Sequence, residues 1–167
     1  MKIADRVAEL PPYVFARLGQ RIRELTAQGK DIIRLDIGSP DLPPPDFIVE
    51  AMIRSTQEPS HHGYGGYYGT PQLRSAMAAY YGRRFGVGLD PDSQVCPLIG
   101  SKEGIANVAQ AFVDPGVLVL VPDPGYPTYS LGTLLAGGVP YRFPLLATDG
   151  LLPDLEAIPE NVARSAR

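Results

Sequence analysis

Apolar residues near the N-terminus recur at the spacing of one face of a helix, at Val14, Phe15, Leu18, Ile22 and Leu25. This pattern predicts a helix over 12–28, and a glycine at position 29 is a common way to end one. A second helix is predicted over 45–57 and a third over 70–86. In the third, Thr70 can cap the first turn, Pro71 suits the first helical position, and Gly86 closes the helix.

The remaining patterned segments are short apolar runs that alternate with further helical spacing. Strands are predicted over 31–38, 94–100, 116–122 and 139–145, and helices over 102–113 and 127–138. From residue 94 the order is therefore strand, helix, strand, helix, strand, which predicts an α/β fold with a parallel sheet. Ligands of such sheets bind at the carboxyl ends of the strands. The tail, 152–167, is predicted as a linking helix or turn without a final strand.

The composition is rich in the residues that form loops. The chain has 18 prolines and 18 glycines in 167 residues, and many of them gather in GSPDLPPPD (38–46), HHGYGGYYGTP (61–71) and VPDPGYP (121–127). Each cluster lies between patterned segments rather than in a low-complexity tract. This distribution indicates long loops of specific shape, and loops of that kind tend to carry function.

Charge and cysteine content narrow the classes of partner. The net charge of −3 gives no electrostatic reason to expect nucleic acid or an anionic membrane as a partner. The single cysteine, Cys96, excludes an internal disulfide and fits a reducing compartment. The N-terminus lacks a signal-peptide core, and no apolar run is long enough to span a bilayer. A cytoplasmic protein is the expectation.

The segment LIGSKEG (98–104) places Ser101 and Lys102 at the start of a predicted helix. Backbone amides at a helix start point outward and bind anions, and a hydroxyl and an ammonium group would strengthen such a site. A capped helix with a solvated lysine explains the same residues. Neither a Walker motif nor GxGxxG is present, which argues against a nucleoside triphosphate or a dinucleotide.

Three other loops offer candidate residues, each with an ordinary structural alternative. Tyr126 stands among prolines after a predicted strand, where its ring could stack on a flat ligand or pack under its own loop. Tyr64, between glycines, could donate to an anion or belong to a flexible loop. The adjacent His61 and His62 lack further ligands at metal-binding spacing, so no metal site is predicted. Gly38 could admit a ligand close to the backbone or simply form a turn.

The order of these motifs resembles the N-terminal part of fold-type I, class I/II aminotransferases. The segments that carry the resemblance are YVFARL, LDIGSPDLPPP, GYGGYYGTPQLRSAMAAYYGRRFGV, LIGSKEGIANVAQAFVDPG and VLVPDPGYPTYSLGTLLAGG, between about Leu10 and Ile158. They look most like the LL-diaminopimelate aminotransferase-like branch, which also contains aspartate and alanine aminotransferases. The resemblance implies part of a three-layer αβα large domain over 41–167 and a small-domain segment over 1–40.

The resemblance also implies a cofactor, pyridoxal 5'-phosphate (PLP), and assigns roles to residues. Ser101 and Lys102 match the residues that hold the PLP phosphate, and Tyr126 matches the aromatic that stacks on the pyridine ring. Tyr64 matches the tyrosine that reaches the phosphate from the neighbouring subunit, which implies a homodimer with shared sites. For substrate, Gly38 matches the glycine whose backbone meets the carboxylate, and Tyr13 matches a substrate-side tyrosine.

The catalytic residues of this family have no counterpart within the chain. The Schiff-base lysine, the aspartate that pairs with the pyridine nitrogen and the arginine that binds the α-carboxylate are all expected beyond Arg167. The only lysines present are Lys2, Lys30 and Lys102. We therefore expect a fragment of an aminotransferase that does not transaminate by itself. The alternative is an inactive remnant of the PLP fold or a binding module.

Overall fold

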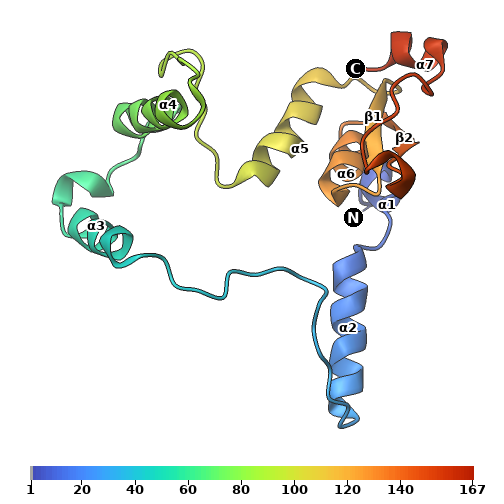
Figure 1. The fold of residues 1–167 in the computed structure, drawn as a ribbon, viewed down its shortest axis with the longest axis horizontal. Helices are drawn as coiled ribbons and strands as arrows, with labels where there is room; N and C mark the ends of the chain where they lie inside the picture. The colour runs from blue at the N-terminus through green and yellow to red at the C-terminus, as the bar shows by residue number, and fades with distance from the viewer. Residues whose placement is uncertain (1) are drawn as a thin grey trace. The chain divides into compact units, whose positions relative to one another are not determined.

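The computed structural model describes residues 2–167, which form two compact units. The helical unit is Pro12–Pro97, and the sheet unit combines the residues up to Pro11 with Leu98–Arg167. The helical unit contains α2 (Val14–Ala27), α3 (Asp46–Thr56), the 3-10 helix η1 (Pro59–His62) and α4 (Pro71–Phe85) (Figure 1). The sheet unit contains two strands, β1 (Leu118–Asp123) and β2 (Val139–Pro144). Its helices are α1 (Asp5–Ala8), α5 (Ser101–Phe112), α6 (Pro127–Leu135), the 3-10 helix η2 (Ala147–Asp149) and α7 (Glu160–Ser165).

All five helices predicted from the sequence are confirmed as α2 to α6, with small shifts at their ends. Gly29 follows α2 with φ of +78°, a left-handed conformation that glycine adopts at low cost. At the start of α4, the Thr70 hydroxyl accepts a hydrogen bond from the Leu73 amide at 3.3 Å, and Gly86 ends the helix in a left-handed conformation. Local sequence signals therefore set these helix ends.

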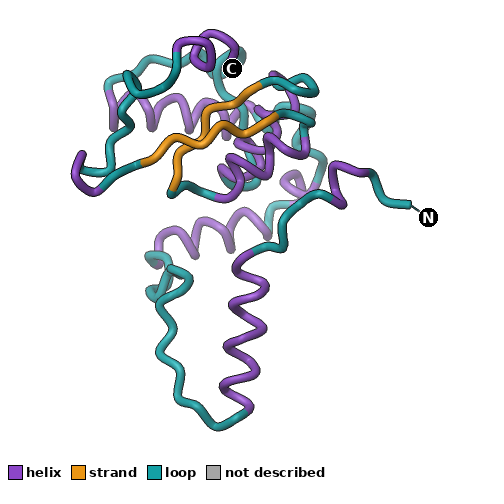
Figure 2. The backbone as a smooth tube through the Cα atoms, turned by 90° about the vertical axis from the view of Figure 1, so that its right-hand side faces the viewer, coloured by secondary structure: helices purple, strands orange, loops and turns teal. Residues whose placement is uncertain are grey.

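The sheet unit is built on a strand–helix–strand motif with parallel strands. β1 and β2 pair in parallel from Leu118 opposite Val139 to Asp123 opposite Pro144, and α6 makes the crossover between them. Figure 2 shows the two strands side by side with helices around them. The α/β fold with a parallel sheet is thus confirmed for the chain from α5 onward.

The core of the molecule lies in the sheet unit. Every buried residue among residues 2–167 belongs to this unit: Val121, Gly132, Thr133, Gly138, Ile158 and Val162. The hydroxyl of buried Thr133 donates to the Tyr129 carbonyl at 2.8 Å, so its burial leaves no unsatisfied polar group. By contrast, no residue of Pro12–Pro97 is buried.

The strand predicted over 31–38 is wrong. The segment is irregular, and Ile33 and Leu35 are almost fully exposed. Within it, the Arg34 guanidinium donates two hydrogen bonds to the Asp36 carboxylate, at 3.0 and 2.8 Å. A strand also needs a hydrogen-bonded neighbour, and residues 2–167 supply none for this segment.

The strand predicted over 94–100 is wrong for the same reason, since no neighbouring backbone within residues 2–167 pairs with it. At the other end of the chain, the structure adds pairing that the sequence did not predict. Ala166 forms a parallel bridge with Leu118, and the Arg167 amide donates to the Leu118 carbonyl at 2.9 Å. The start of β1 therefore has a neighbour on both sides, and the tail is a helix followed by strand-like pairing.

The helical and sheet units are defined by packing within this chain, and they do not test the domain boundary expected near residue 40. That boundary stays a prediction. None of the helices found in residues 2–167 has both the length and the apolar character needed to cross a membrane.

Candidate functional site

The turn into α5 has the geometry of an anion-binding helix start. Gly100 precedes the helix with φ of +83° and ψ of 152°, which a residue with a side chain rarely adopts. Ser101 and Lys102 are the first two residues of a helix 12 residues long. The first amides of a helix lack intrahelical acceptors, and the Ser101 hydroxyl has no hydrogen-bond partner within residues 2–167. Donors are thus available at this turn.

Glu103 lies in the same turn and would repel an anion if its carboxylate faced the helix start. The carboxylate accepts a hydrogen bond of 2.7 Å from the Ile99 amide, just before the helix, so its charge is engaged by a donor of this chain. This contact satisfies the amide that precedes the glycine and fixes the entry of the chain. No sequence motif assigned a role to Glu103.

Tyr126 follows β1 at the start of α6, and a tight turn places it there. The Asp123–Pro124 peptide bond is cis. A Cβ atom on Gly125 would lie 2.3 Å from the Pro122 carbonyl oxygen, so only glycine fits at this position. The Tyr126 ring is about two-fifths exposed and meets Tyr129 edge-on, with 5.9 Å between the ring centroids.

Lys102 and Tyr126 come together within the sheet unit, although they are 24 residues apart in the sequence. The Lys102 Nζ atom lies 5.5 Å from the centroid of the Tyr126 ring. Packing of α5 on α6 brings their first turns close, and the two helices approach at Gly132, opposite Ala106 and Ala109. A cation at a helix start therefore lies beside the face of a flat aromatic ring.

This arrangement changes the acidity of the phenol. Hydrogen bonding from Lys102, and then from Thr128, lowers the pKa of Tyr126 below its ordinary value of 10.0. In the Lys102→Met variant we expect the pKa of Tyr126 to return towards that value, because the methionine side chain keeps the length but loses the charge and the donors. Titration of phenolate absorbance, with the Tyr126→Phe variant as the spectral reference, measures the shift. An unchanged titration curve would contradict the contact.

Tyr64 lies in the helical unit, on a glycine-rich loop between η1 and α4, and its side chain is fully exposed. Two histidines tie the start of this loop to α3. The His61 Nδ1 atom lies 3.0 Å from the Ser55 hydroxyl, and the His62 Nε2 atom donates to the Thr56 carbonyl at 3.0 Å. Within residues 2–167 there is no cluster of three or more histidine, cysteine or acidic residues that could hold a metal ion.

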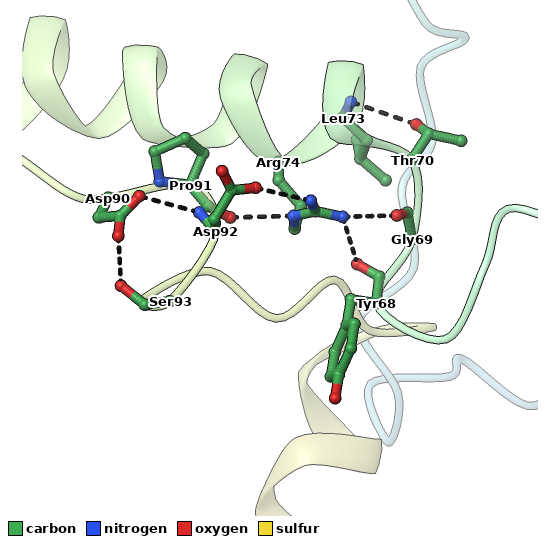
Figure 3. A network of polar contacts seen from close by, with 9 residues as sticks. All are labelled: Tyr68, Gly69, Thr70, Leu73, Arg74, Asp90, Pro91, Asp92 and Ser93. Atoms are coloured by element: carbon green, nitrogen blue, oxygen red, sulfur yellow. Dashed lines mark hydrogen bonds and ion pairs between the residues drawn. The ribbon is translucent and has the colours of Figure 1, made fainter.

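The end of the same loop is held by Arg74, a residue the sequence analysis did not single out (Figure 3). Its guanidinium donates to the carbonyls of Tyr68, Gly69 and Pro91 at 3.3, 2.6 and 2.9 Å, and it forms an ion pair of 2.8 Å with Asp92. Only the position of an arginine one turn into the helix after a glycine-rich loop could have pointed to it. Thr128, which hydrogen-bonds to Tyr126, was not predicted either, because a threonine two residues after a tyrosine matches no sequence motif.

The two residues expected to contact substrate also lie in the helical unit. Tyr13 precedes α2 and its ring meets Phe15, with 5.6 Å between centroids. Gly38 lies in the irregular segment after the Arg34–Asp36 pair, and no other atom comes within 4 Å of a Cβ atom placed there. The open space at Gly38 fits a close approach by a ligand as well as an ordinary turn. Of the predicted site residues, Ser101, Lys102 and Tyr126 are thus brought together.

Comparison with known proteins identifies the family of this chain. The sequence profile of aminotransferase class I and II matches residues 30–166. The chain belongs to the class I and II aminotransferases. Members of this family use PLP, a flat ring with a phosphate group, and the paired helix start and aromatic ring of the sheet unit fit such a cofactor. The resemblance inferred from the motifs is confirmed.

Individual relatives of this aminotransferase chain point to one branch. The chain is 55% identical over 164 residues to an LL-diaminopimelate aminotransferase from Desulforudis audaxviator strain MP104C, which covers 98% of this chain and 42% of that protein. Identity to the enzyme of the same name from Aquifex aeolicus strain VF5 is 49% over 166 residues, covering 99% and 43%. The chain therefore spans less than half the length of these relatives.

Solved structures give the same family and fold. BacF from Bacillus subtilis, in its apo form, matches with a TM-score of 0.89 and 40% identity, over 100% of this chain and 43% of that one. The alanine aminotransferase from Pyrococcus furiosus matches with a TM-score of 0.88 and 30% identity, over 99% and 42%. The chain has the architecture of part of a fold-type I aminotransferase.

Proposed function

We propose that the chain supplies the phosphate-binding part of the PLP site in an aminotransferase that transfers an amino group from an amino acid to a 2-oxo acid. The observation that carries the proposal is the meeting of the α5 start, with Ser101 and Lys102, and the Tyr126 ring within one compact unit. A helix start attracts phosphate, and a ring beside it suits a pyridine.

Each residue has a distinct task in this proposal. The amides at the start of α5 and the Ser101 hydroxyl donate to the phosphate, and Lys102 neutralises its charge. Tyr126 stacks on the pyridine ring. When bound, PLP supplies the electron sink that makes the α-proton of an amino acid removable. The Gly38 backbone and Tyr13 receive the substrate. None of the three lysines of the chain is assigned as the covalent partner of PLP.

The assembly and the substrate are part of the same proposal. Tyr64 is fully exposed and would reach the phosphate held by a second subunit, so we propose a homodimer with shared sites. Residues 1–40 would belong to a small domain and 41–167 to the large domain, in a cytoplasmic enzyme. LL-diaminopimelate is the proposed amino donor, because relatives at 55% and 49% identity carry that name, whereas the alanine aminotransferase is 30% identical.

Comparing PLP with pyridoxal, which lacks the phosphate, tests the cofactor assignment. Equilibrium dialysis of the purified protein is expected to show PLP bound at least about tenfold more tightly, since charge-assisted hydrogen bonds to the phosphate stabilise the complex. Equal affinities would overturn the proposed site. Amino transfer is measured on the polypeptide that carries this chain in the cell, with LL-diaminopimelate, aspartate and alanine as donors. Preference for aspartate or alanine would overturn the substrate assignment.

A further inference from the structure

The loop that carries Tyr64 is not fixed by apolar packing. The Tyr64 side chain is fully exposed and makes no ring contact with another aromatic among residues 2–167. Gly66 and Gly69 adopt left-handed conformations, with φ of +78° and +73°. Glycines leave a loop with many accessible conformations, and ordering it costs entropy. A defined position for Tyr64 therefore needs polar contacts to the loop backbone.

Arg74 provides such contacts from the first turns of α4. Its side chain is 12% exposed, and four acceptors surround the guanidinium: the carbonyls of Tyr68, Gly69 and Pro91, and the Asp92 carboxylate (Figure 3). Two of these acceptors are consecutive carbonyls at the end of the Tyr64 loop. A planar guanidinium can hold acceptors in several directions at fixed angles, which a lysine ammonium does less well.

The turn that carries the other two acceptors, Pro91 and Asp92, has hydrogen bonds of its own. The Asp90 carboxylate accepts hydrogen bonds from the Asp92 amide at 3.1 Å and from the Ser93 hydroxyl, and the Asp90 amide donates to the Gln94 side chain at 2.8 Å. The hydrogen bond from the Ser93 hydroxyl, followed by the one from the Asp92 amide, lowers the pKa of Asp90 below its ordinary range. Arg74 thus joins the Tyr64 loop to a second, ordered turn.

The residue next to Tyr64 lies close to the end of the loop that Arg74 holds. Gly65, the residue after Tyr64, lies against the end of the loop: a Cβ atom there would be 3.5 Å from Thr70 Cγ2 and 3.9 Å from Gly69 Cα. The carbonyl of that same Gly69 is the acceptor at 2.6 Å from Arg74. The residue that Arg74 holds therefore lies close to the neighbour of Tyr64 in the chain.

We propose that Arg74 is a positioning residue, which orders the glycine-rich loop so that the Tyr64 phenol is presented to the cofactor phosphate. This inference rests on the proposed function for the phosphate contact, whereas the clamp itself rests on the four contacts of Arg74. Arg74 touches neither cofactor nor substrate in this scheme.

A double-mutant cycle on the purified protein tests the coupling, with PLP affinity measured by equilibrium dialysis and pyridoxal as the ligand without phosphate. With Arg74 present, Tyr64→Phe is expected to weaken PLP binding about fivefold, the equivalent of one hydrogen bond. In the Arg74→Ala background the same change is expected to have less than about a twofold effect, because the phenol is no longer presented. Equal effects in both backgrounds would overturn the inference.

Hydrogen exchange of the amides in 63–70 is the second readout, and it needs no cofactor. Exchange is expected to be faster in Arg74→Ala, intermediate in Arg74→Lys and unchanged in Arg83→Ala, the matched control on the same helix. If Arg74→Ala does not fold, Arg74→Lys carries both measurements. Unchanged exchange in a folded Arg74 variant would overturn the clamp.

The two readouts separate failure of this inference from failure of the proposed function. Wild-type protein that binds PLP and pyridoxal equally would overturn the proposed function and, with it, the role of Arg74 towards a phosphate. A retained preference for PLP with no coupling between Arg74 and Tyr64 would overturn the positioning role alone.

Discussion

Lys102→Met is expected to weaken PLP binding by about 30-fold, because a charge-assisted hydrogen bond to phosphate is worth about 2 kcal/mol. Methionine keeps the length of the side chain at the start of α5 while removing the charge beside the Tyr126 ring. Equilibrium dialysis at low ionic strength measures the change. The loss is expected to shrink as salt is added, since screening weakens the contribution of an exposed charge.

Two comparisons make this result specific. Lys30→Met removes the same charge just after the end of α2 and is expected to leave PLP binding unchanged. Binding of pyridoxal to the Lys102→Met variant is expected to equal that of the wild-type protein, because the lost interaction is with the phosphate. If Lys102→Met and Lys30→Met bound PLP equally well, Lys102 would not be a phosphate ligand.

Gly125→Ala is expected to lower the free energy of unfolding by about 2 to 3 kcal/mol. The added Cβ atom would stand 2.3 Å from the Pro122 carbonyl oxygen and 3.1 Å from Pro122 Cγ, so the turn after β1 must open. Neither neighbour can rotate away, because one is backbone and the other belongs to a proline ring. Urea unfolding followed by circular dichroism measures the change.

A matched glycine separates the clash from a general effect of alanine. Gly88→Ala places its Cβ atom in open space, with no other atom within 4 Å and no left-handed φ, and is expected to be neutral or slightly stabilising. Because the turn at Gly125 also sets the place of Tyr126, Gly125→Ala is expected to weaken PLP binding as well. Equal unfolding free energies for the two variants would show that the turn tolerates a side chain.

The helices were predictable because their signals are local. Thr70 caps α4 and Gly86 ends it through contacts within a few residues, so the sequence around them suffices. The strands over 31–38 and 94–100 were predicted from the same kind of local pattern, and both predictions failed. A strand exists only where another segment bonds to it, and no local pattern reports whether that neighbour is present.

For the candidate site too, the local features were predictable from the sequence and the contacts between distant segments were not. The motif around Ser101 and Lys102 places donors at a helix start, and this followed from the sequence alone. The approach of Lys102 to Tyr126 did not follow, because it depends on how α5 packs on α6. The contacts of Arg74 did not follow either, since three of its four acceptors are backbone carbonyls, and any residue can supply a carbonyl.

The sequence by itself determined the family, the helices, the parallel order of β1 and β2, and the residues at the start of α5. Hydrophobic spacing, capping residues and glycine-rich turns act over a few positions and are written directly in the chain. Tertiary structure decided which segments became strands, that Ala166 pairs beside Leu118, and that Arg74 holds the Tyr64 loop. Those outcomes depend on hydrogen-bond partners that no local pattern specifies and that only the folded chain brings within reach.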